Sequence, residues 1–204
     1  MASRRSWLLI RHGETDASAK GEFRSFTESD LTAVGQASAR LIGEQLAALT
    51  PSAVFSSPAR RAIDTARLAG FSPTLDPDLA EWNLGDLEGL GAERFRTDHP
   101  GWSLFLDGPP DGSGESTTQV RARAERVAQC LEDESSETTA IFSHGQFLRV
   151  LALTMVGLDL DVAPRLSFGP GRTAFITERA HGRVFGGWNL PAVGLAEAVH
   201  AGWS

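Results

Sequence analysis

The stretch "WLLIRHGETDAS", residues 7–18, places four apolar residues directly before an arginine, a histidine and a glycine. So short an apolar run predicts a buried strand, because most helices need more residues. Gly13 would let the chain turn sharply where this strand ends. Arg11 and His12 then stand at the carboxyl end of a strand, which is where open α/β sheets bind their ligands.

Strands and helices alternate along the rest of the chain. Helical spacing of apolar residues predicts helices over 30–51, 58–70, 115–134 and 146–158. Strands are predicted within 7–10, 52–57, 138–145, 173–179 and 182–189, the last two joined by a turn at His181-Gly182. This alternation implies a largely parallel sheet that helices cover on both faces, so the predicted fold class is α/β.

The composition describes one globular domain. The 204 residues are 41% hydrophobic and 22% charged, which supports a sizeable core and argues against disorder. The formal net charge of −7 argues against non-specific binding to nucleic acid or to anionic membranes. Cys130 is the single cysteine and cannot form an internal disulfide, which suits a reducing compartment. The apolar run near the start is too short for a signal peptide or a membrane span, so we expect a cytoplasmic protein.

Arginines also begin the helix predicted over 58–70. Arg60 and Arg61 stand where a cation opposes the helix dipole, at a cost of about 0.3–1 kcal/mol each when exposed. That cost is easier to understand if one arginine binds an anion; two solvated arginines are the alternative.

Three more polar residues are candidates for chemistry. His144 precedes a glycine in "FSHG", again at the end of a predicted strand. Glu81 lies beside Trp82 in "LAEWNLGDLEGL", where apolar neighbours favour a protonated carboxyl group, although by itself it reads as a surface glutamate. Ser18 is a hydroxyl in the loop after His12 and means little alone.

Together these groups suit the hydrolysis of a phosphate monoester. Two arginines can bind the dianion bidentately and stabilise charge in the transition state. A neutral imidazole can attack phosphorus to give a phosphohistidine that water later hydrolyses. A glutamic acid can protonate the leaving alkoxide and then activate the water. No metal is required, because arginine and protonated histidine supply the positive charge.

Four motifs, in this order, resemble the histidine phosphatase superfamily, the phosphoglycerate-mutase-like enzymes. They are "LLIRHGET", "SSPxxRAxxTA", "LAEWNLGDLEG" and "FSHGQFLR", and with "GGWN" near the end they cover most of the chain. The resemblance implies a three-layer α/β/α sandwich with a mostly parallel central sheet. It also implies a single domain over 1–204, with a small cap-like insertion around 86–115.

The resemblance assigns roles to individual residues. His12 would be the phosphorylated nucleophile, and Arg11 a phosphate clamp. Arg61 would be the second clamp, because the family arginine directly precedes alanine in "PARRA". His144 would bond the phosphoryl oxygens and Glu81 would be the proton donor. The remaining candidates for binding substrate or phosphate are Ser18, Phe23, Arg24, Ser25, Trp82 and Gly145.

The rim of this site departs from the family or allows a second reading. Ser25 stands where many members have a glycine that approaches the substrate. Phe23, Phe26, Trp82 and Trp102 are predicted to line an apolar mouth, with core packing as the alternative. Arg24 is a candidate to bind a second phosphate or carboxylate of the substrate. The alternative is that it is a solvated loop arginine.

The segment between Glu81 and His144 is short, which resembles the small phosphatase branch more than the mutases. We therefore expect a metal-independent phosphomonoesterase that acts on a small phosphorylated metabolite, such as a sugar phosphate, with no metal or cofactor. One alternative is a cofactor-dependent phosphoglycerate mutase, which would need 2,3-bisphosphoglycerate. The other is a catalytically silent module that binds phospho-ligands or proteins. The expected partner is a small phosphate ester, and edge strands with exposed aromatic residues are compatible with a homodimer.

Overall fold

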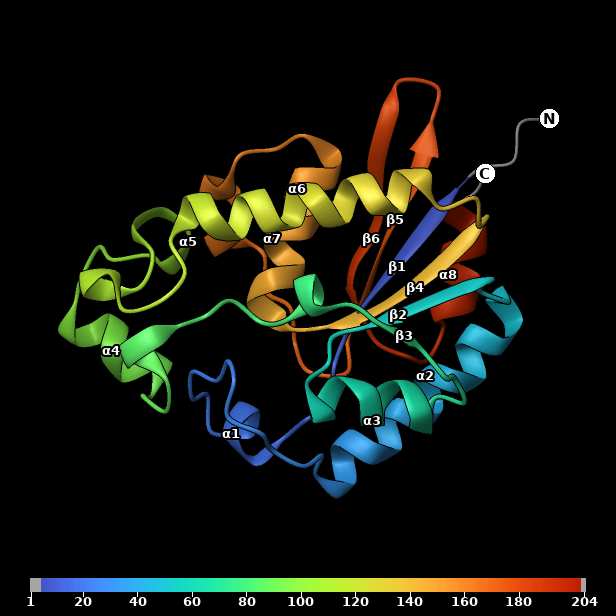
Figure 1. Cartoon of the computed structure of the whole chain (residues 1–204). Helices are drawn as coiled ribbons and strands as arrows, with labels where there is room; N and C mark the ends of the chain where they lie inside the picture. The colour runs from blue at the N-terminus through green and yellow to red at the C-terminus, as the bar shows by residue number, and fades with distance from the viewer. Residues whose placement is uncertain (1–4, 203–204) are drawn as a thin grey trace.

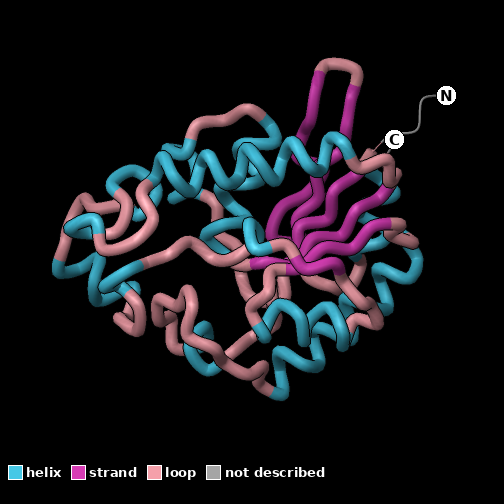
Figure 2. Tube along the Cα trace, in the orientation of Figure 1, coloured by secondary structure: helices cyan, strands magenta, loops and turns pink. Residues whose placement is uncertain are grey.

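The computed structural model describes residues 5–202, and a six-stranded sheet lies at its centre (Figures 1 and 2). The strand order is β3-β2-β4-β1-β5-β6. The strands are β1 (Ser6–Arg11), β2 (Ala53–Ser56), β3 (Thr74–Leu75), β4 (Thr138–Ser143), β5 (Thr173–Arg179) and β6 (Gly182–Leu190). Strands β1 to β4 run parallel to one another, whereas β5 pairs antiparallel with both β1 and β6. The predicted α/β class with a mostly parallel sheet is confirmed.

Strand β1 lies between two hydrophobic cores because its side chains alternate. Trp7 and Leu9 pack into the core on one face of the sheet. Leu8 and Ile10 pack into the core on the other face. Successive side chains of a strand point to opposite faces, so an unbroken apolar run can supply both cores.

Helices cover both faces, which completes the three layers (Figure 1). One face carries α2 (Ala33–Leu49), α3 (Arg60–Leu68) and α8 (Leu195–Gly202). The other carries α6 (Thr117–Asp133) and α7 (Gly145–Val156), which pack against each other. The four long helices predicted from apolar spacing are all present.

Local sequence explains where these helices begin. Thr32 caps α2 by accepting a hydrogen bond from the Gly35 N–H. Ser116 and Gln119 form a capping box at the start of α6, so two of the backbone N–H groups left free at a helix start find partners.

Several short elements carry no clear periodic signal. They are α1 (Asp16–Ala19), α4 (Ala92–Asp98), α5 (Leu104–Asp107) and the 3₁₀ turns η1 (Pro77–Leu79), η2 (Gly85–Leu87), η3 (Pro110–Gly112) and η4 (Leu160–Arg165). In Figure 1, α4 and α5 lie toward the same end of the strands as α1, which follows the carboxyl end of β1. The segment 86–115, predicted as a cap-like insertion, contains α4 and α5 and stands near the carboxyl end of the sheet.

Gly13 is required for a close approach and not for a special backbone angle. Its φ is not positive. A Cβ built at Gly13 would lie only 2.6 Å from the Gly35 carbonyl oxygen. The absence of a side chain therefore lets the β1 loop pack directly against the first turn of α2.

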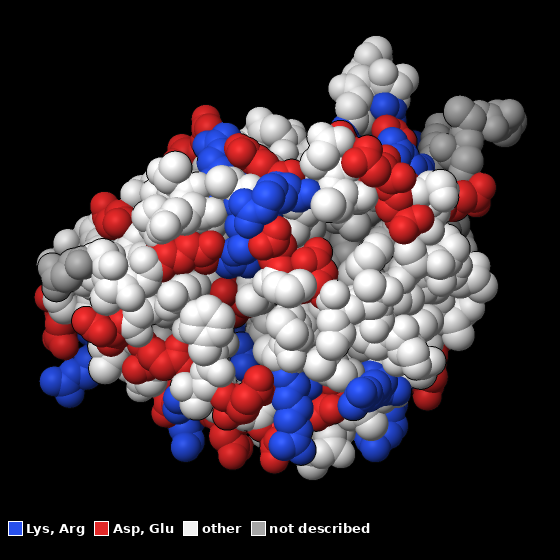
Figure 3. Space-filling view, in the orientation of Figure 1, with Lys and Arg blue, Asp and Glu red and all other residues white. Residues whose placement is uncertain are grey.

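The surface carries charges of both signs. On the face shown in Figure 3, acidic side chains are widespread and basic ones lie among them. Within residues 5–202 no helix combines the length and apolar character needed to cross a lipid bilayer. The first four residues, which belong to the segment that we expect not to be a signal peptide, lie outside the described part of the chain.

Candidate active site

The carboxyl ends of β1 and β4 meet at one edge of the sheet and present two histidines. The strands are parallel neighbours, with Arg11 opposite Ser143. The His12 N–H donates to the Ser143 carbonyl at 2.9 Å. His12 and His144, the next residue after each strand, lie side by side, with ring centroids 5.2 Å apart and an interplanar angle of 62°.

His12 is held as a neutral imidazole with one free nitrogen. Its Nδ1 lies 2.8 Å from the Gly13 carbonyl oxygen. A carbonyl can only accept a hydrogen bond, so Nδ1 carries the proton and Nε2 keeps its lone pair. Burial lowers the pKa of His12 well below 6.5, and the nearby charges of Arg11 and Arg61 lower it further. This protonation state is the one that a nucleophilic imidazole needs.

His144 is fully buried behind His12 and is oriented by a serine. Its Nε2 lies 2.8 Å from the Ser57 hydroxyl oxygen, whereas its Nδ1 is buried without a hydrogen-bond partner. Burial lowers the pKa of His144 well below 6.5, and the charge of Arg61 is the next cause. The Ser57 hydroxyl therefore fixes the orientation of the His144 ring.

Arg11 brings a buried guanidinium to the same place. One of its terminal nitrogens donates to the Phe168 carbonyl, while its Nε is buried without a partner. Burial lowers the pKa of Arg11 to about 10, although the charge of Glu81 opposes this effect. Arg11 therefore stays charged at neutral pH and has an N–H group to donate to a ligand.

Arg61 and Arg60 begin the same helix but have different surroundings. Arg61 is buried, and its guanidinium donates to the carbonyls of Ser25 at 2.7 Å and Thr27 at 3.3 Å. Arg60 is exposed and forms ion pairs with Asp30 and Asp64. Only Arg61 of the two reaches the site, and burial lowers its pKa as well.

Glu81 lines the same cavity as His12, and its carboxyl group is hydrogen-bonded by backbone N–H groups. It accepts hydrogen bonds from Trp82 at 2.8 Å, Gln146 at 3.1 Å and Phe147 at 2.8 Å. The last two lie in the first turn of α7, where a carboxylate also interacts favourably with the helix dipole. These donors fix the orientation of the Glu81 carboxyl group, and two of them come from a helix far away in the sequence.

Arg123 holds the loop that carries Glu81. It donates to the carbonyls of Asp78 and Ala80, both at 2.7 Å, and of Glu81 at 3.3 Å. It also forms a 2.6 Å ion pair with Glu115. Hydrogen bonds to both the backbone and the side chain of Glu81 therefore fix its position.

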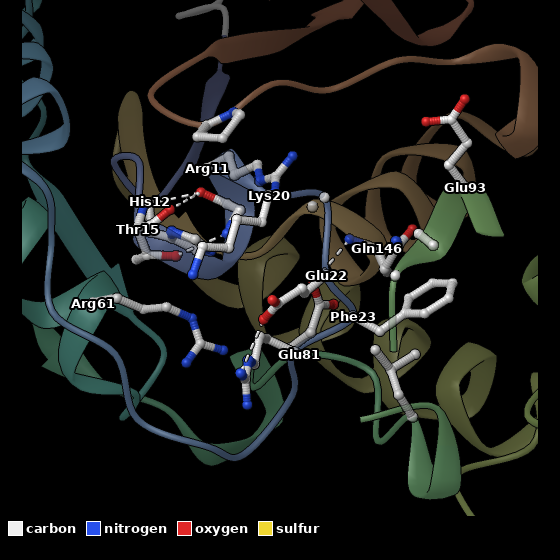
Figure 4. A pocket seen from close by; sticks show the side chains of 18 of the residues that line it. Arg11, His12, Thr15, Lys20, Glu22, Phe23, Arg61, Glu81, Glu93 and Gln146 are labelled. Carbon is white, nitrogen blue, oxygen red and sulfur yellow. Dashed lines mark hydrogen bonds and ion pairs between the residues drawn. The ribbon is translucent and has the colours of Figure 1, made fainter. Parts of the chain in front are cut away.

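These groups surround a cavity of about 520 Å³ (Figure 4). Predicted residues that line it are Arg11, His12, Ser18, Phe23, Arg24, Arg61, Glu81 and Gly145. His144 stands behind His12 and is not in its wall. The cavity is thus lined by an imidazole, three carboxylates and a larger number of cations, which include the groups needed to bind and attack a phosphate ester.

Several rim residues have other contacts. The Ser18 hydroxyl exchanges hydrogen bonds with the Thr15 backbone. Arg24 forms a 3.0 Å ion pair with Glu22. Ser25 and Trp82 do not line the cavity: Ser25 hydrogen-bonds Arg61 and Glu88, and Trp82 is buried in the core.

The other aromatic residues that we expected at the mouth are dispersed. Phe26 is 63% exposed, and Trp102 lines a neighbouring cavity. Of the four aromatic candidates, only Phe23 reaches the cavity beside His12.

Sequence reasoning missed four residues with clear places here. Ser57 orients His144, and Thr65 accepts a hydrogen bond from the Gly13 N–H at 2.9 Å. Lys20 and Gln146 line the cavity. Ser57 and Thr65 belong to the motif "SSPxxRAxxTA", and Gln146 to "FSHGQFLR", so their positions in these motifs were the available signal.

Comparison with known proteins agrees with this geometry. The model of the histidine phosphatase superfamily (branch 1) matches residues 7–191. An acid phosphatase from Mycobacterium tuberculosis is 40% identical over 164 residues, which cover 78% of this chain and 80% of the relative.

Two other relatives carry different names. A probable phosphoglycerate mutase from an Enterobacter species is 32% identical over 167 residues, 78% of each chain. A metal-independent phosphoserine phosphatase from Arabidopsis thaliana is 35% identical over 161 residues, 72% of this chain and 66% of that one.

The fold is also known from solved structures. The structure of an open reading frame product from Mycobacterium tuberculosis superimposes with a TM-score of 0.87 at 34% identity and covers 92% of this chain and 98% of that one. The chain therefore belongs to the histidine phosphatase superfamily, branch 1, and is a phosphomonoesterase of that family.

Proposed function

We propose that the protein hydrolyses small phosphorylated metabolites through a phosphohistidine on His12, without a metal ion. The observation that carries this proposal is the free Nε2 of a neutral His12 beside two buried guanidinium groups. Arg11 Nε is buried and has no hydrogen-bond partner, and Arg61 adds a second buried guanidinium. A phosphoryl group in this place would satisfy these donors while its phosphorus faces the nucleophile.

The reaction runs in two steps, phosphorylation of His12 and hydrolysis of the phosphohistidine. The lone pair on His12 Nε2 attacks phosphorus, a P–N bond forms, and the P–O bond to the leaving alcohol breaks. Glu81, protonated in the reacting complex, gives its proton to the departing oxygen. Water then attacks the phosphohistidine, Glu81 takes a proton from that water, and inorganic phosphate leaves with the P–N bond broken. Arg11 and Arg61 neutralise the phosphoryl oxygens in both steps.

The size and charge of the cavity favour a small anionic substrate. A volume of about 520 Å³ is within the ordinary range for small-molecule sites. Cationic side chains outnumber carboxylates in its wall. Sugar phosphates and similar metabolites fit this description.

A mutase is the second candidate, because a probable phosphoglycerate mutase is among the relatives. A mutase must shield its phosphohistidine from water and retain a bisphosphate. The short segment between Glu81 and His144 offers little additional chain for such a cover. A silent binding module is third, because both the nucleophile and the proton donor are present.

Phosphorus NMR separates these candidates. The purified protein is mixed with 3-phosphoglycerate and catalytic 2,3-bisphosphoglycerate, and in a second tube with p-nitrophenyl phosphate. Inorganic phosphate from the aryl ester without isomerisation supports the proposal. Rapid formation of 2-phosphoglycerate would make the protein a mutase, and no reaction in either tube would favour the silent module.

A further inference from the structure

A second cavity adjoins the first. It has a volume of about 640 Å³ and shares Phe23, Arg96 and Gln146 with the cavity beside His12. Its wall runs from α5 across the start of α7 to the loop over 164–169. A group bound at His12 can therefore extend past Gln146 into this second space.

The second cavity is strongly positive. Arg96, Arg149 and Arg165 line it, and its wall contains no aspartate or glutamate. Aromatic side chains form other parts of the wall: Phe23, Trp102, Phe105 and Phe168. Arginines on apolar walls, without neighbouring carboxylates, suit an anion better than a neutral ligand.

Arg149 is the least exposed of these three arginines, and its charge has no ion-pair partner. It is mostly buried, its Nε donates to the Gly145 carbonyl of its own helix at 3.1 Å, and its guanidinium stacks on Phe105 at 4.9 Å. Among the side chains that the structure describes, no aspartate or glutamate lies within ion-pair distance of it. A charge removed from water without a counter-charge is unfavourable, so a ligand anion would complete this arrangement.

The electrostatic surroundings of Arg149 agree with this geometry. Burial lowers its pKa to about 10, and the charge of Arg11 is the next cause. Arg96 acts in the same direction, whereas Glu81 opposes it. Arg149 thus belongs to the same positive field as the phosphate clamp, but it lines the second cavity and not the first.

Gln146 stands at the boundary between the two cavities. Its backbone N–H donates to Glu81, and its side-chain oxygen Oε1 is buried without a hydrogen-bond partner. Gln146 and Arg149 are three residues apart on α7 and therefore lie on the same face of the helix. A ligand that extends from His12 to Arg149 would pass Gln146, which lines both cavities.

We propose that the second cavity binds a second anionic group of the substrate, with Arg149 as its main ligand. The substrate is then a phosphate monoester that carries a carboxylate or a second phosphoryl group on the part beyond the scissile bond. This inference rests on the proposed phosphatase function and narrows it to dianionic esters with a further negative charge. Arg165 and Arg96 stand at the more exposed rim of the same subsite.

Matched substrates test this proposal. The phosphate esters of ω-hydroxycarboxylic acids, over a series of chain lengths, are compared with those of the corresponding primary amides and phosphonates. Each amide has the shape of its acid without the charge. We expect the wild-type kcat/KM for the acid or the phosphonate to exceed that for the amide by about tenfold or more at the chain length that reaches Arg149. The two charged series show which anion the subsite prefers.

Variants of the second cavity identify the residue responsible. Arg149→Gln should reduce the preference for the charged ester by about tenfold, whereas p-nitrophenyl phosphate, which lacks a second anion, is hydrolysed as by the wild type. Arg165→Gln should give a smaller reduction in the preference for the charged ester. It replaces Arg149→Gln as the test if that variant does not fold. Arg40→Gln, which removes an exposed arginine on α2, controls for net charge.

The outcomes separate failure of the subsite from failure of the proposed function. Equal rates for acid, phosphonate and amide at every chain length, with p-nitrophenyl phosphate hydrolysed, overturn the subsite alone. An equal loss with all substrates in Arg149→Gln places this arginine on the reacting phosphoryl group and also overturns the subsite. If the wild type hydrolyses nothing, the proposed function fails. Calorimetric binding of acid and amide to His12→Ala, which lacks the nucleophile, then still decides whether the second cavity prefers the charged compound.

Discussion

The backbone of Gly145 lies directly against the guanidinium of Arg11. A Cβ built at Gly145 would stand 2.9 Å from Arg11 Cζ, closer than a methyl group can approach. The motif "FSHGQFLR", which contains Gly145, and the motif "LLIRHGET", which contains Arg11, are therefore in close contact at this point. We expect Gly145→Ala to displace Arg11 and to lower kcat/KM by about tenfold to a hundredfold. Steady-state kinetics measure this effect, and circular dichroism verifies that the variant is folded. An unchanged kcat/KM would contradict the prediction.

The two buried histidines should remain neutral in mild acid. The pKa values of His12 and His144 lie well below 6.5, chiefly because burial penalises the charged imidazole. Long-range ¹H–¹⁵N NMR of the ligand-free enzyme at about pH 5.5, one unit below the ordinary histidine pKa, should show both rings neutral. His12 should be the Nδ1–H tautomer because of its hydrogen bond to Gly13. Protonated rings at this pH would show that water reaches the site.

The same pKa values predict a loss of stability in acid. In the unfolded chain both histidines take up protons near pH 6.5, whereas in the folded chain His12 and His144 do not. The unfolded state then binds more protons, so the free energy of unfolding falls as the pH drops below about 6.5, by up to about 1.4 kcal/mol per pH unit for each histidine.

Urea unfolding at a series of pH values measures this slope. Between about pH 6.5 and pH 5, where most carboxyl groups remain ionised, the double variant His12→Gln/His144→Gln should have the smaller slope. An identical pH dependence in the wild type and the double variant would mean that other groups control acid stability.

Removal of the nucleophile should abolish the reaction. Because the phosphoryl group must be carried on Nε2 of His12, His12→Ala should form no phosphoenzyme and retain no measurable turnover of p-nitrophenyl phosphate. Acid-quench trapping with labelled substrate measures the phosphoenzyme directly. Full activity in this variant would exclude the phosphohistidine mechanism.

The role of Glu81 should depend on the leaving group. Glu81→Gln cannot donate a proton, so we expect alkyl phosphate hydrolysis, with its basic leaving oxygen, to slow by about 10²–10⁴-fold. Phosphorylation by p-nitrophenyl phosphate should slow far less, because nitrophenolate departs without a proton. Single-turnover rates for the two esters are needed, since Glu81 also serves the later hydrolysis of phosphohistidine. Equal losses in the first step would assign Glu81 a positioning role.

The sequence was informative where function depends on short stretches of chain. The apolar run before Arg11 and His12 predicted β1, and the spacing of apolar residues predicted the long helices, because both signals are local and periodic. The motif that contains Arg60 and Arg61 indicated which of the two enters the site, and the structure buries Arg61 and exposes Arg60.

Contacts between distant segments were not accessible in the same way. Trp82 looked suited to the mouth of the site but is buried in the core, because its neighbours come from α5 and from Glu115. The antiparallel pairing of β5 with β1 is likewise a property of the assembled sheet.

The sequence by itself determined the chemical groups of this site: the imidazoles, the two arginines and the glutamate, each attached to a recognisable strand or helix end. Only the tertiary structure decided their electrostatic states and neighbours. N–H groups of α7 orient the carboxyl group of Glu81, Ser57 orients His144, and Arg149 lines a cavity without a counter-charge. The physical reason is that hydrogen bonds, burial and the field of nearby charges arise between residues far apart in the chain, where no periodic pattern records them.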